Sequence, residues 1–388
     1  MEYCFDEVLD RRGTNCIKWD YTEDIFGKKD ILPLWVADMD FPVPPAVQKA
    51  LKERAEHPIY GYSGFPISFF EAFANWMKKR HGWQVDRDWV IPTPGVVPAI
   101  ALTINSFTKE GDKIVIQPPV YPPFFSVVKN NHRELVYNPL LETEEGYKMD
   151  FDNLEKKLDE RTKMLVFCNP HNPVGRVWKE EELKELVRIC SANDILIVSD
   201  EIWSDIVFAG NEHRPIAQVA GDYSSKIITC MATSKTFNLA GLKTSATVIS
   251  HPELREKFCE TMNRLGLGKI NVMGTTSFTA AYNHGQEWLE DLLEYLEENV
   301  KFLLEFLKKR MPKVRAKYPE GTFVVWLDFN EYGFSDEELQ EKTVQGARVG
   351  LNPGYSFGEQ GKGFLRINIG CPRPILEEAM ERLAREFE

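Results

Sequence analysis

The chain has 388 residues and carries 47 Lys and Arg against 59 Asp and Glu, a formal charge of -12. An acidic balance without a clustered basic face argues against nucleic acid as the main partner. The seven cysteines are scattered, with no Cys-x-x-Cys pair and no Cys/His cluster at metal-ligand spacing, so we expect neither a disulfide framework nor a bound metal.

The N-terminus lacks the basic start and apolar core of a signal peptide, and no apolar run approaches membrane-spanning length. We therefore expect a cytoplasmic protein that does not bind membranes. Its length predicts a large core, in two domains or in one large domain with an appendage.

The first half of the chain alternates predicted helices and strands. Gly95 precedes a helix with Pro98 in its first turn. Helical spacing of apolar residues also predicts a helix over residues 181–193. Apolar runs of strand length cover residues 113–117, 163–169, 195–200, 226–231 and 244–250. Because these runs do not alternate with polar residues, we predict an α/β fold with a mostly parallel sheet covered on both faces.

After about residue 285 the pattern changes to one long amphipathic helix, which Met311 and Pro312 end. Two strands are predicted over residues 323–329 and 364–369, and a final helix from about Pro374. This part predicts a smaller α+β unit. We expect a large domain over residues 49–288 and a small domain made of residues 1–48 and 289–388.

Polar residues follow several of the predicted strands. In open parallel sheets, ligands bind beyond the carboxyl ends of the strands. Asn172 follows the second strand in an Asn-Pro-His-Asn-Pro loop, Asp200 ends the third, and Lys235 follows the fourth between Ser234 and Thr236. Taken singly, these are also typical of a turn, a salt bridge and a surface lysine.

The combination is more specific than its parts. An amine nucleophile, a buried carboxylate, a strand-end Asn and a phosphate-accepting helix start are what a Schiff-base pyridoxal phosphate enzyme requires. Lys235 would form the Schiff base, and Asp200 would keep the pyridine nitrogen protonated. The backbone N–H groups that follow Gly95 would hold the phosphate.

Five segments carry a resemblance to a known family: 37–41 (Ala-Asp-Met-Asp-Phe), 61–63 (Gly-Tyr-Ser), 169–173 (Asn-Pro-His-Asn-Pro), 234–238 (Ser-Lys-Thr-Phe-Asn) and 370–373 (Gly-Cys-Pro-Arg). The chain resembles fold-type I pyridoxal phosphate-dependent transferases, specifically class I/II aminotransferases. Within them it is most similar to the bacterial carbon–sulfur β-lyases, of the cystathionine β-lyase and cystalysin type.

The resemblance implies roles for single residues. Lys235 is the Schiff-base lysine and the catalytic base, Asp200 the partner of the ring nitrogen, and Asn172 the partner of the ring hydroxyl. Tyr121 stacks on the cofactor ring. The phosphate is held by the backbone at the N-terminal end of the predicted helix, at Gly95, Val96 and Val97. The side chains of Ser234 and Lys243 help to hold it.

The substrate carboxylate is clamped by Arg366, together with the Ala37 backbone and Asn172. Tyr62 reaches the phosphate of a neighbouring subunit, which implies a homodimer with shared active sites. His171 is expected to shape its loop rather than to catalyse.

Two cofactor-site positions depart from the wider family. Aminotransferases of the aspartate type usually carry Tyr three residues after the Asp, and the lyases often carry His, but this chain has Trp203. Indole cannot accept a hydrogen bond. Lys243 stands where many aminotransferases have an Arg, which keeps a cation but loses the bidentate fork.

Three functions are consistent with these residues. The first is a β-lyase that releases pyruvate, ammonia and a thiol from cystathionine or related cysteine derivatives. The second is an aminotransferase, which uses the same cofactor contacts. The third is a protein that keeps the fold for regulatory protein binding, a role that replacement of Lys235 would leave intact.

Overall fold

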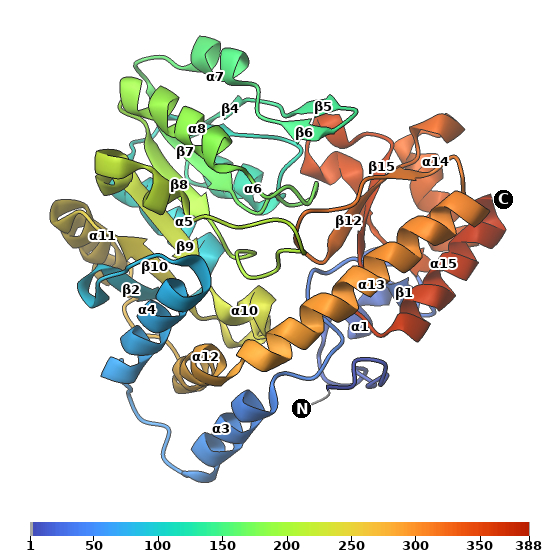
Figure 1. The fold of residues 1–388 in the computed structure, drawn as a ribbon, viewed down its shortest axis with the longest axis horizontal. Coiled ribbons are helices and arrows are strands. Elements are labelled where there is room, and N and C mark those ends of the chain that lie inside the picture. Colours follow the sequence, from blue (N-terminus) through green and yellow to red (C-terminus); the bar gives the residue numbers. More distant parts are fainter. Residues whose placement is uncertain (1–2, 388) are drawn as a thin grey trace.

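The structure is a computed structural model that describes residues 3–387, built around two larger β-sheets and one long helix (Figure 1). The larger sheet has seven strands in the order β2-β10-β9-β8-β7-β3-β4. Strand β10 runs antiparallel to both of its neighbours, and the other pairings are parallel. The bounds are β2 (Val90–Thr93), β3 (Lys113–Ile116), β4 (Glu134–Tyr137), β7 (Thr162–Cys168), β8 (Leu196–Asp200), β9 (Ile227–Met231) and β10 (Ser245–Ile249).

The five predicted strands of this sheet are confirmed to within one residue at each end. Both faces of the sheet are covered, as predicted. Ile114 and Ile116 of β3 belong to a buried cluster with α5 (Val96–Phe107), α6 (Pro123–Asn130) and α11 (Pro252–Arg264). Val115, between them, points to the other face and joins a cluster with α8 (Glu180–Ala192). A strand buried on both faces must be apolar at every position, which explains the continuous runs.

The smaller sheet is antiparallel and has the order β11-β12-β15-β14, with bounds β11 (Arg315–Ala316), β12 (Val324–Asp328), β14 (Asn352–Pro353) and β15 (Phe364–Asn368). A short parallel ladder pairs β1 (Leu32–Pro33) with β13 (Val349–Gly350). The N-terminal segment therefore lies beside the C-terminal part of the chain.

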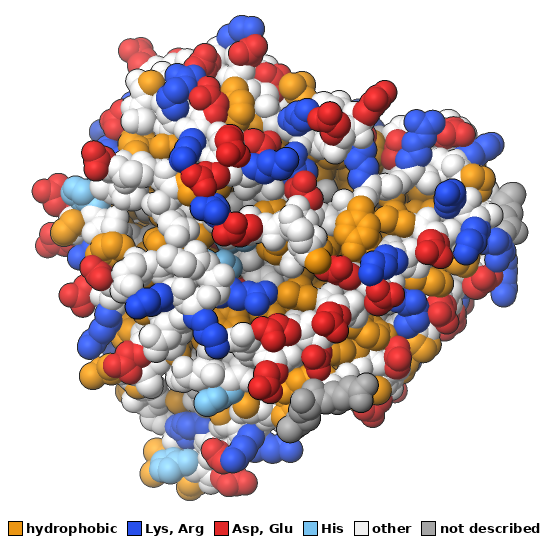
Figure 2. Space-filling model, in the orientation of Figure 1, with side chains coloured by type: hydrophobic (Ala, Val, Ile, Leu, Met, Phe, Trp, Pro, Cys, Tyr) orange, Lys and Arg blue, Asp and Glu red, His pale blue; other side chains and the backbone are white. Residues whose placement is uncertain are grey.

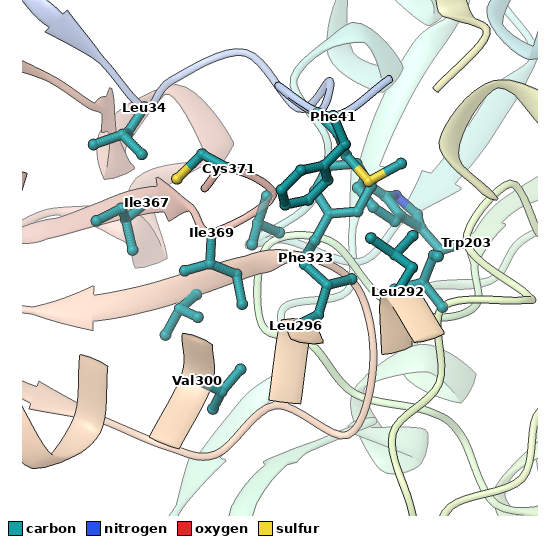
Figure 3. Close-up of a cluster of buried hydrophobic side chains, with 14 of the residues drawn as sticks. Leu34, Phe41, Trp203, Leu292, Leu296, Val300, Phe323, Ile367, Ile369 and Cys371 are labelled. Carbon is teal, nitrogen blue, oxygen red and sulfur yellow. The ribbon is translucent and has the colours of Figure 1, made fainter. Parts of the chain in front are cut away.

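The long helix α13 (Gln286–Arg310) extends from the C-terminal end of α12 (Val272–His284) toward the smaller sheet (Figure 1). Its apolar face, including Leu292, Leu296 and Val300, packs against Phe323 and Ile369 from the smaller sheet region (Figure 3). The same core takes in Leu34, Phe41, Ile367 and Cys371 (Figure 3). The amphipathic pattern of residues 285–311 is thus confirmed as a helix with one buried face.

The remaining helices lie around the sheets (Figure 1). They are α1 (Ile17–Asp20), α2 (Thr22–Phe26), α3 (Pro45–Glu56), α4 (Ile67–His81), α7 (Phe151–Lys157), α9 (Ile216–Val219), α10 (Thr233–Thr236), α12 (Val272–His284), α14 (Asp336–Glu341) and α15 (Arg373–Phe387). A hairpin of β5 (Leu141–Thr143) and β6 (Gly146–Lys148) projects toward the smaller sheet. Among residues 3–387, no helix has the length and apolar character needed to cross a membrane. Nor do the described residues contain a group of three or more His, Cys, Asp or Glu that could hold a metal ion.

Candidate active site

A cavity of about 390 Å³ opens at the carboxyl ends of β7, β8 and β9. This is the edge of a parallel sheet at which ligands bind. Predicted site residues account for most of its lining, namely Gly95, Val96, Val97, Tyr121, Asn172, Asp200, Trp203, Ser234, Lys235 and Lys243. Residues far apart in the sequence therefore meet in one place, as the motifs predicted.

Lys235 lies on the short helix α10, directly after β9. Its Nζ donates a hydrogen bond to the Ala37 carbonyl oxygen at 2.5 Å and lies 5.2 Å from the centre of the Trp203 ring. Burial, helped by the positive charge of Arg366, lowers the pKa of Lys235 to about 8, and the charge of Asp38 offsets part of this effect. A lysine with this pKa has a much larger neutral fraction near physiological pH than an ordinary lysine, and the neutral form is the one that acts as a nucleophile or base.

Asp200 ends β8 and is 3% exposed. One carboxylate oxygen accepts a hydrogen bond from the Ile202 N–H at 3.1 Å, and no described residue donates to the other. Burial raises the pKa of Asp200 from its usual 3.8 to about 7. A buried carboxylate without a cationic partner is costly. The protonated ring nitrogen of pyridoxal phosphate is a cation of the required kind, so this residue fits that cofactor.

The N-terminal end of α5 forms one wall of the cavity. Gly95 adopts φ +119, a conformation that L side chains rarely reach, and its N–H donates to the Ser245 hydroxyl at 3.1 Å. Val96 and Val97 are the first residues of α5, so their N–H groups have no acceptor within the helix, and no other described residue accepts from them. Free N–H groups, the helix dipole and the nearby Lys243 make this wall suited to a phosphate.

Arg366 projects from β15 and is 4% exposed. Its Nη1 donates to the Asn172 side-chain oxygen at 3.0 Å, and its Nη2 donates to the Trp35 carbonyl at 2.8 Å and to the side chain of Asn352. Its Nε has no partner, and within the described chain no carboxylate pairs with the guanidinium. Burial lowers the pKa of Arg366 to about 10, so it stays charged at neutral pH. A buried, unpaired guanidinium beside the cavity fits an anionic substrate group.

An ionic network holds the segment that carries Ala37. Fully buried Lys18 contacts Asp40 at 2.5 Å, and Arg11 bridges Asp38 at 2.7 Å and Asp40 at 2.6 Å. Lys18 and Asp40 are paired away from solvent, and the partly exposed Arg11 and Asp38 complete the network, so the backbone between them is held in place. No local pattern in the sequence indicates this network, because its cations and acids are 20 or more residues apart.

Other predicted residues have simple placements. Tyr121 lines the cavity, and burial, with the nearby Asp200 charge, raises the pKa of its hydroxyl. The His171 ring nitrogen Nε2 donates to the Pro119 carbonyl at 2.9 Å, and burial lowers the pKa of His171 to about 4, so the ring is neutral. This placement agrees with a loop-shaping role for His171.

Trp203 lies between the cavity and the core. It is 2% exposed, and its ring meets that of Phe323 edge-on at 4.5 Å (Figure 3). The indole therefore links the lysine to the core under the smaller sheet.

Tyr62 is absent from the cavity lining. It is fully exposed, on an extended segment before α4 that also exposes Ile59 and Tyr60. Its assignment to the site of a neighbouring subunit stays a prediction. The sequence interpretation also missed Cys168 and Thr244, which line the cavity, and Asn352, which binds Arg366. Asn352 lies on the neighbouring strand opposite Arg366, a proximity that only the strand pairing reveals.

Comparisons with known proteins agree with this geometry. The family model for aminotransferase class I and II matches residues 29–383. Cystathionine beta-lyase PatB of Bacillus subtilis (strain 168) is 43% identical over 380 residues, covering 98% of each chain. The crystal structure of a pyridoxal phosphate-bound putative aminotransferase from Clostridium difficile 630 superposes with a TM-score of 0.98 at 45% identity, covering 100% of both chains. Cystalysin from Treponema denticola, whose crystal structure contains pyridoxal 5'-phosphate, gives a TM-score of 0.97 at 35% identity, covering 100% of this chain and 99% of its own. The chain belongs to the aminotransferase class I and II family.

Proposed function

We propose that the protein is a pyridoxal phosphate-dependent carbon–sulfur β-lyase, which cleaves L-cystathionine or related cysteine derivatives to pyruvate, ammonia and a thiol. One observation carries the proposal: Lys235 and the buried Asp200 line one cavity, buried Arg366 donates a hydrogen bond to Asn172 in its wall, and none of the three forms a salt bridge among the described residues. The likeness to a cystathionine beta-lyase over nearly the whole chain supports the choice of reaction.

Different residues of the cavity would hold different parts of the cofactor. Lys235 would hold the cofactor covalently through Nζ, Asp200 would face its ring nitrogen, and the α5 N-terminus with Ser234 and Lys243 would hold its phosphate. When bound, pyridoxal phosphate supplies an electron sink for negative charge at the substrate Cα. The buried carboxylate keeps that sink effective by favouring the protonated ring.

Proton transfer is the task of Lys235. Once its Nζ is free, the lowered pKa leaves a neutral amine that removes the proton from the substrate Cα. Arg366 binds the α-carboxylate, alongside the Asn172 side chain and the Ala37 backbone, and so orients the Cα–H bond. The Cβ–S bond then breaks with loss of thiolate, and the released enamine hydrolyses to pyruvate and ammonia.

The test is release of pyruvate and thiol from L-cystathionine without any keto acid. We expect multiple turnovers from the wild type and none detectable from Lys235→Ala. Lys226→Ala is the matched control, because Lys226 is a surface lysine paired with Asp194 and should keep full activity. If the wild type forms product only when a keto acid is added, the lyase proposal fails.

An aminotransferase is the second candidate. It is favoured by the family itself and by the likeness to a structure described as a putative aminotransferase. The cofactor contacts serve both reactions, so only the dependence on a keto acid separates them.

We further propose a cytoplasmic homodimer with shared active sites, in which Tyr62 reaches the partner's phosphate. Three exposed apolar side chains, Ile59, Tyr60 and Tyr62, support an interface on this segment, and the cysteines of the described chain are all free, which suits a reducing compartment. Sedimentation velocity should give a dimer, and a monomer that binds the cofactor normally would contradict this.

We also propose the division into a large domain (49–288) and a small domain (1–48 with 289–388). It is supported by the ladder between β1 and β13 and by the separate smaller sheet. Limited proteolysis should release a fragment that ends near the start of α13.

A further inference from the structure

A second cavity, of about 650 Å³, lies between the β5–β6 hairpin and the smaller sheet. We call it the hairpin cleft. Its walls come from the hairpin, from residues 315–320 around β11, and from Trp326 and Phe364 of β12 and β15. Figure 1 shows the hairpin beside these strands at the upper right, and Figure 2 shows both acidic and basic side chains on that part of the surface.

The basic side chains that line the hairpin cleft already interact with other residues. Arg176 pairs with Glu182 and Glu320, each at 2.8 Å, and Arg315 pairs with Glu331 at 2.8 Å. Lys317 donates to the Thr143 carbonyl and lies 5.9 Å from the centre of the Tyr147 ring.

Several carboxylates that line the cleft form no ion pair among the described residues. Glu142, Glu144 and Asp328 line the cleft, and none forms an ion pair within the described part of the chain. Among the described residues, the Asp328 carboxylate accepts hydrogen bonds only from Asn330. The unpaired charge of the hairpin cleft is therefore negative.

Two buried polar atoms at the cleft also lack partners. The Tyr147 hydroxyl and the Trp326 indole N–H have no hydrogen-bond partner, although the residues are only 6% and 7% exposed. Burial first, and then the charge of Glu142, raise the pKa of the Tyr147 hydroxyl, the Trp326 indole beside it lowers that pKa in part, and Asp328 has the smallest effect. An unsatisfied buried hydroxyl or N–H is costly unless a ligand or water binds it.

The walls of the cleft are aromatic. Trp326 and Phe364 stack with ring centres 5.1 Å apart and an interplanar angle of 11°, and Tyr147 and Tyr318 complete the lining. Aromatic faces with nearby carboxylates attract organic ammonium groups more than neutral ligands of the same shape.

The hairpin cleft is separate from the cofactor cavity. The two share no lining residue. Phe357, which lines neither cavity, contacts the Trp326 ring at 5.3 Å between ring centres and the Arg366 guanidinium at 5.0 Å. Both cavities can therefore be filled at once.

We propose that the hairpin cleft binds a small organic cation, an ammonium group on an apolar body that also carries a hydrogen-bond acceptor. The ammonium group lies against the aromatic wall between Glu142 and Asp328. The acceptor meets the indole N–H of Trp326.

Choline is the probe for this site, titrated calorimetrically into the cofactor-loaded protein. It carries a quaternary ammonium and a hydroxyl, and because it has no N–H it cannot condense with the cofactor aldehyde. The neutral isostere 3,3-dimethylbutan-1-ol has the same shape without the charge. We expect one choline per chain, bound about tenfold more tightly than the isostere.

Variants locate the site. Glu142 is exposed, so Glu142→Gln should fold normally and weaken choline binding about threefold to fivefold, and Asp328→Asn should act in the same direction. Glu253→Gln is the matched control, because it removes one exposed acid from α11, on the opposite side of the molecule (Figure 1), and should leave the affinity unchanged.

The proposal would be overturned by no binding up to about 20 mM choline, by equal affinity for choline and its isostere, or by equal effects of Glu142→Gln and Glu253→Gln. A choline-induced change in the cofactor absorption band would also overturn it, since the probe would then occupy the active site.

Discussion

Asp200→Asn should stabilise the cofactor-free protein at alkaline pH, although it replaces a residue of the proposed active site. Burial raises the pKa of Asp200 from 3.8 to about 7 in the folded chain. Between these values the folded chain holds a proton that the unfolded chain has lost. Stability therefore falls as the pH rises from about 4 to about 7, and the cost is complete above that range.

The size of the effect follows from the two pKa values. Asn cannot ionise, so the variant avoids a cost of about 2 kcal/mol at pH 5 and about 4 kcal/mol at pH 8. The new amide also needs hydrogen-bond partners, which costs roughly 1–3 kcal/mol at every pH. The pH dependence is therefore the sharper signature: relative to wild type, the variant should gain about 2–3 kcal/mol between pH 5 and pH 8.

Urea unfolding of the cofactor-free proteins at both pH values measures this gain. Asp205→Asn is the matched control for a buried acid. Burial alone would raise the pKa of Asp205, but the hydrogen bond and charge of His81, with the charge of Arg80, outweigh burial and lower it. The control should therefore lose stability relative to wild type as the pH rises through the acid range. If Asp200→Asn is destabilised equally at pH 5 and pH 8, the pKa of Asp200 is not raised by burial, and the carboxylate does not lack a cationic partner.

Three further predictions concern the same cavity. The rate at which pyridoxal phosphate recombines with the cofactor-free protein should rise with pH and level off above about 8, the pKa of Lys235, and a flat profile measured by absorbance would contradict that pKa. Arg366→Lys should raise KM for the amino acid about tenfold or more while changing kcat less. The reason is that one ammonium group cannot replace the guanidinium contacts to Asn172, Trp35 and Asn352. Steady-state kinetics measures this change, and an unchanged KM would contradict it. Trp203→Ala should cost about 3–5 kcal/mol, seen as a lower thermal midpoint, because the indole is buried against Phe323; an unchanged midpoint would mean that the ring is not part of the core.

The sequence predicted the central strands well, because each contains a run of apolar residues that does not alternate with polar ones. The two edge strands of the larger sheet were harder to predict. Strand β2 contains Pro92, which is unusual in a strand, and the edge strand β4 mixes exposed and half-buried residues, so neither gave a clear pattern. The short strands of the smaller sheet, two residues each in β11 and β14, are below the length at which a period can be seen.

The site was predictable where a motif places the chemistry at a strand end, as at Asp200 and Lys235. It was not predictable where a contact depends on tertiary pairing. The network of Arg11 and Lys18 with Asp40, and the contact of Arg366 with Asn352, join segments that nothing local connects. The proposed role of Tyr62 involves a second chain, which the pattern of a single chain does not describe.

Pyruvate formed per active site from L-cystathionine, without any keto acid, tests the central claim most directly. A β-lyase regenerates its cofactor in every cycle, so the protein should form many equivalents of pyruvate and of thiol, in equal amounts. An aminotransferase without an acceptor stops once each cofactor has taken up one amino group. A single equivalent per active site, or no thiol, would contradict the account.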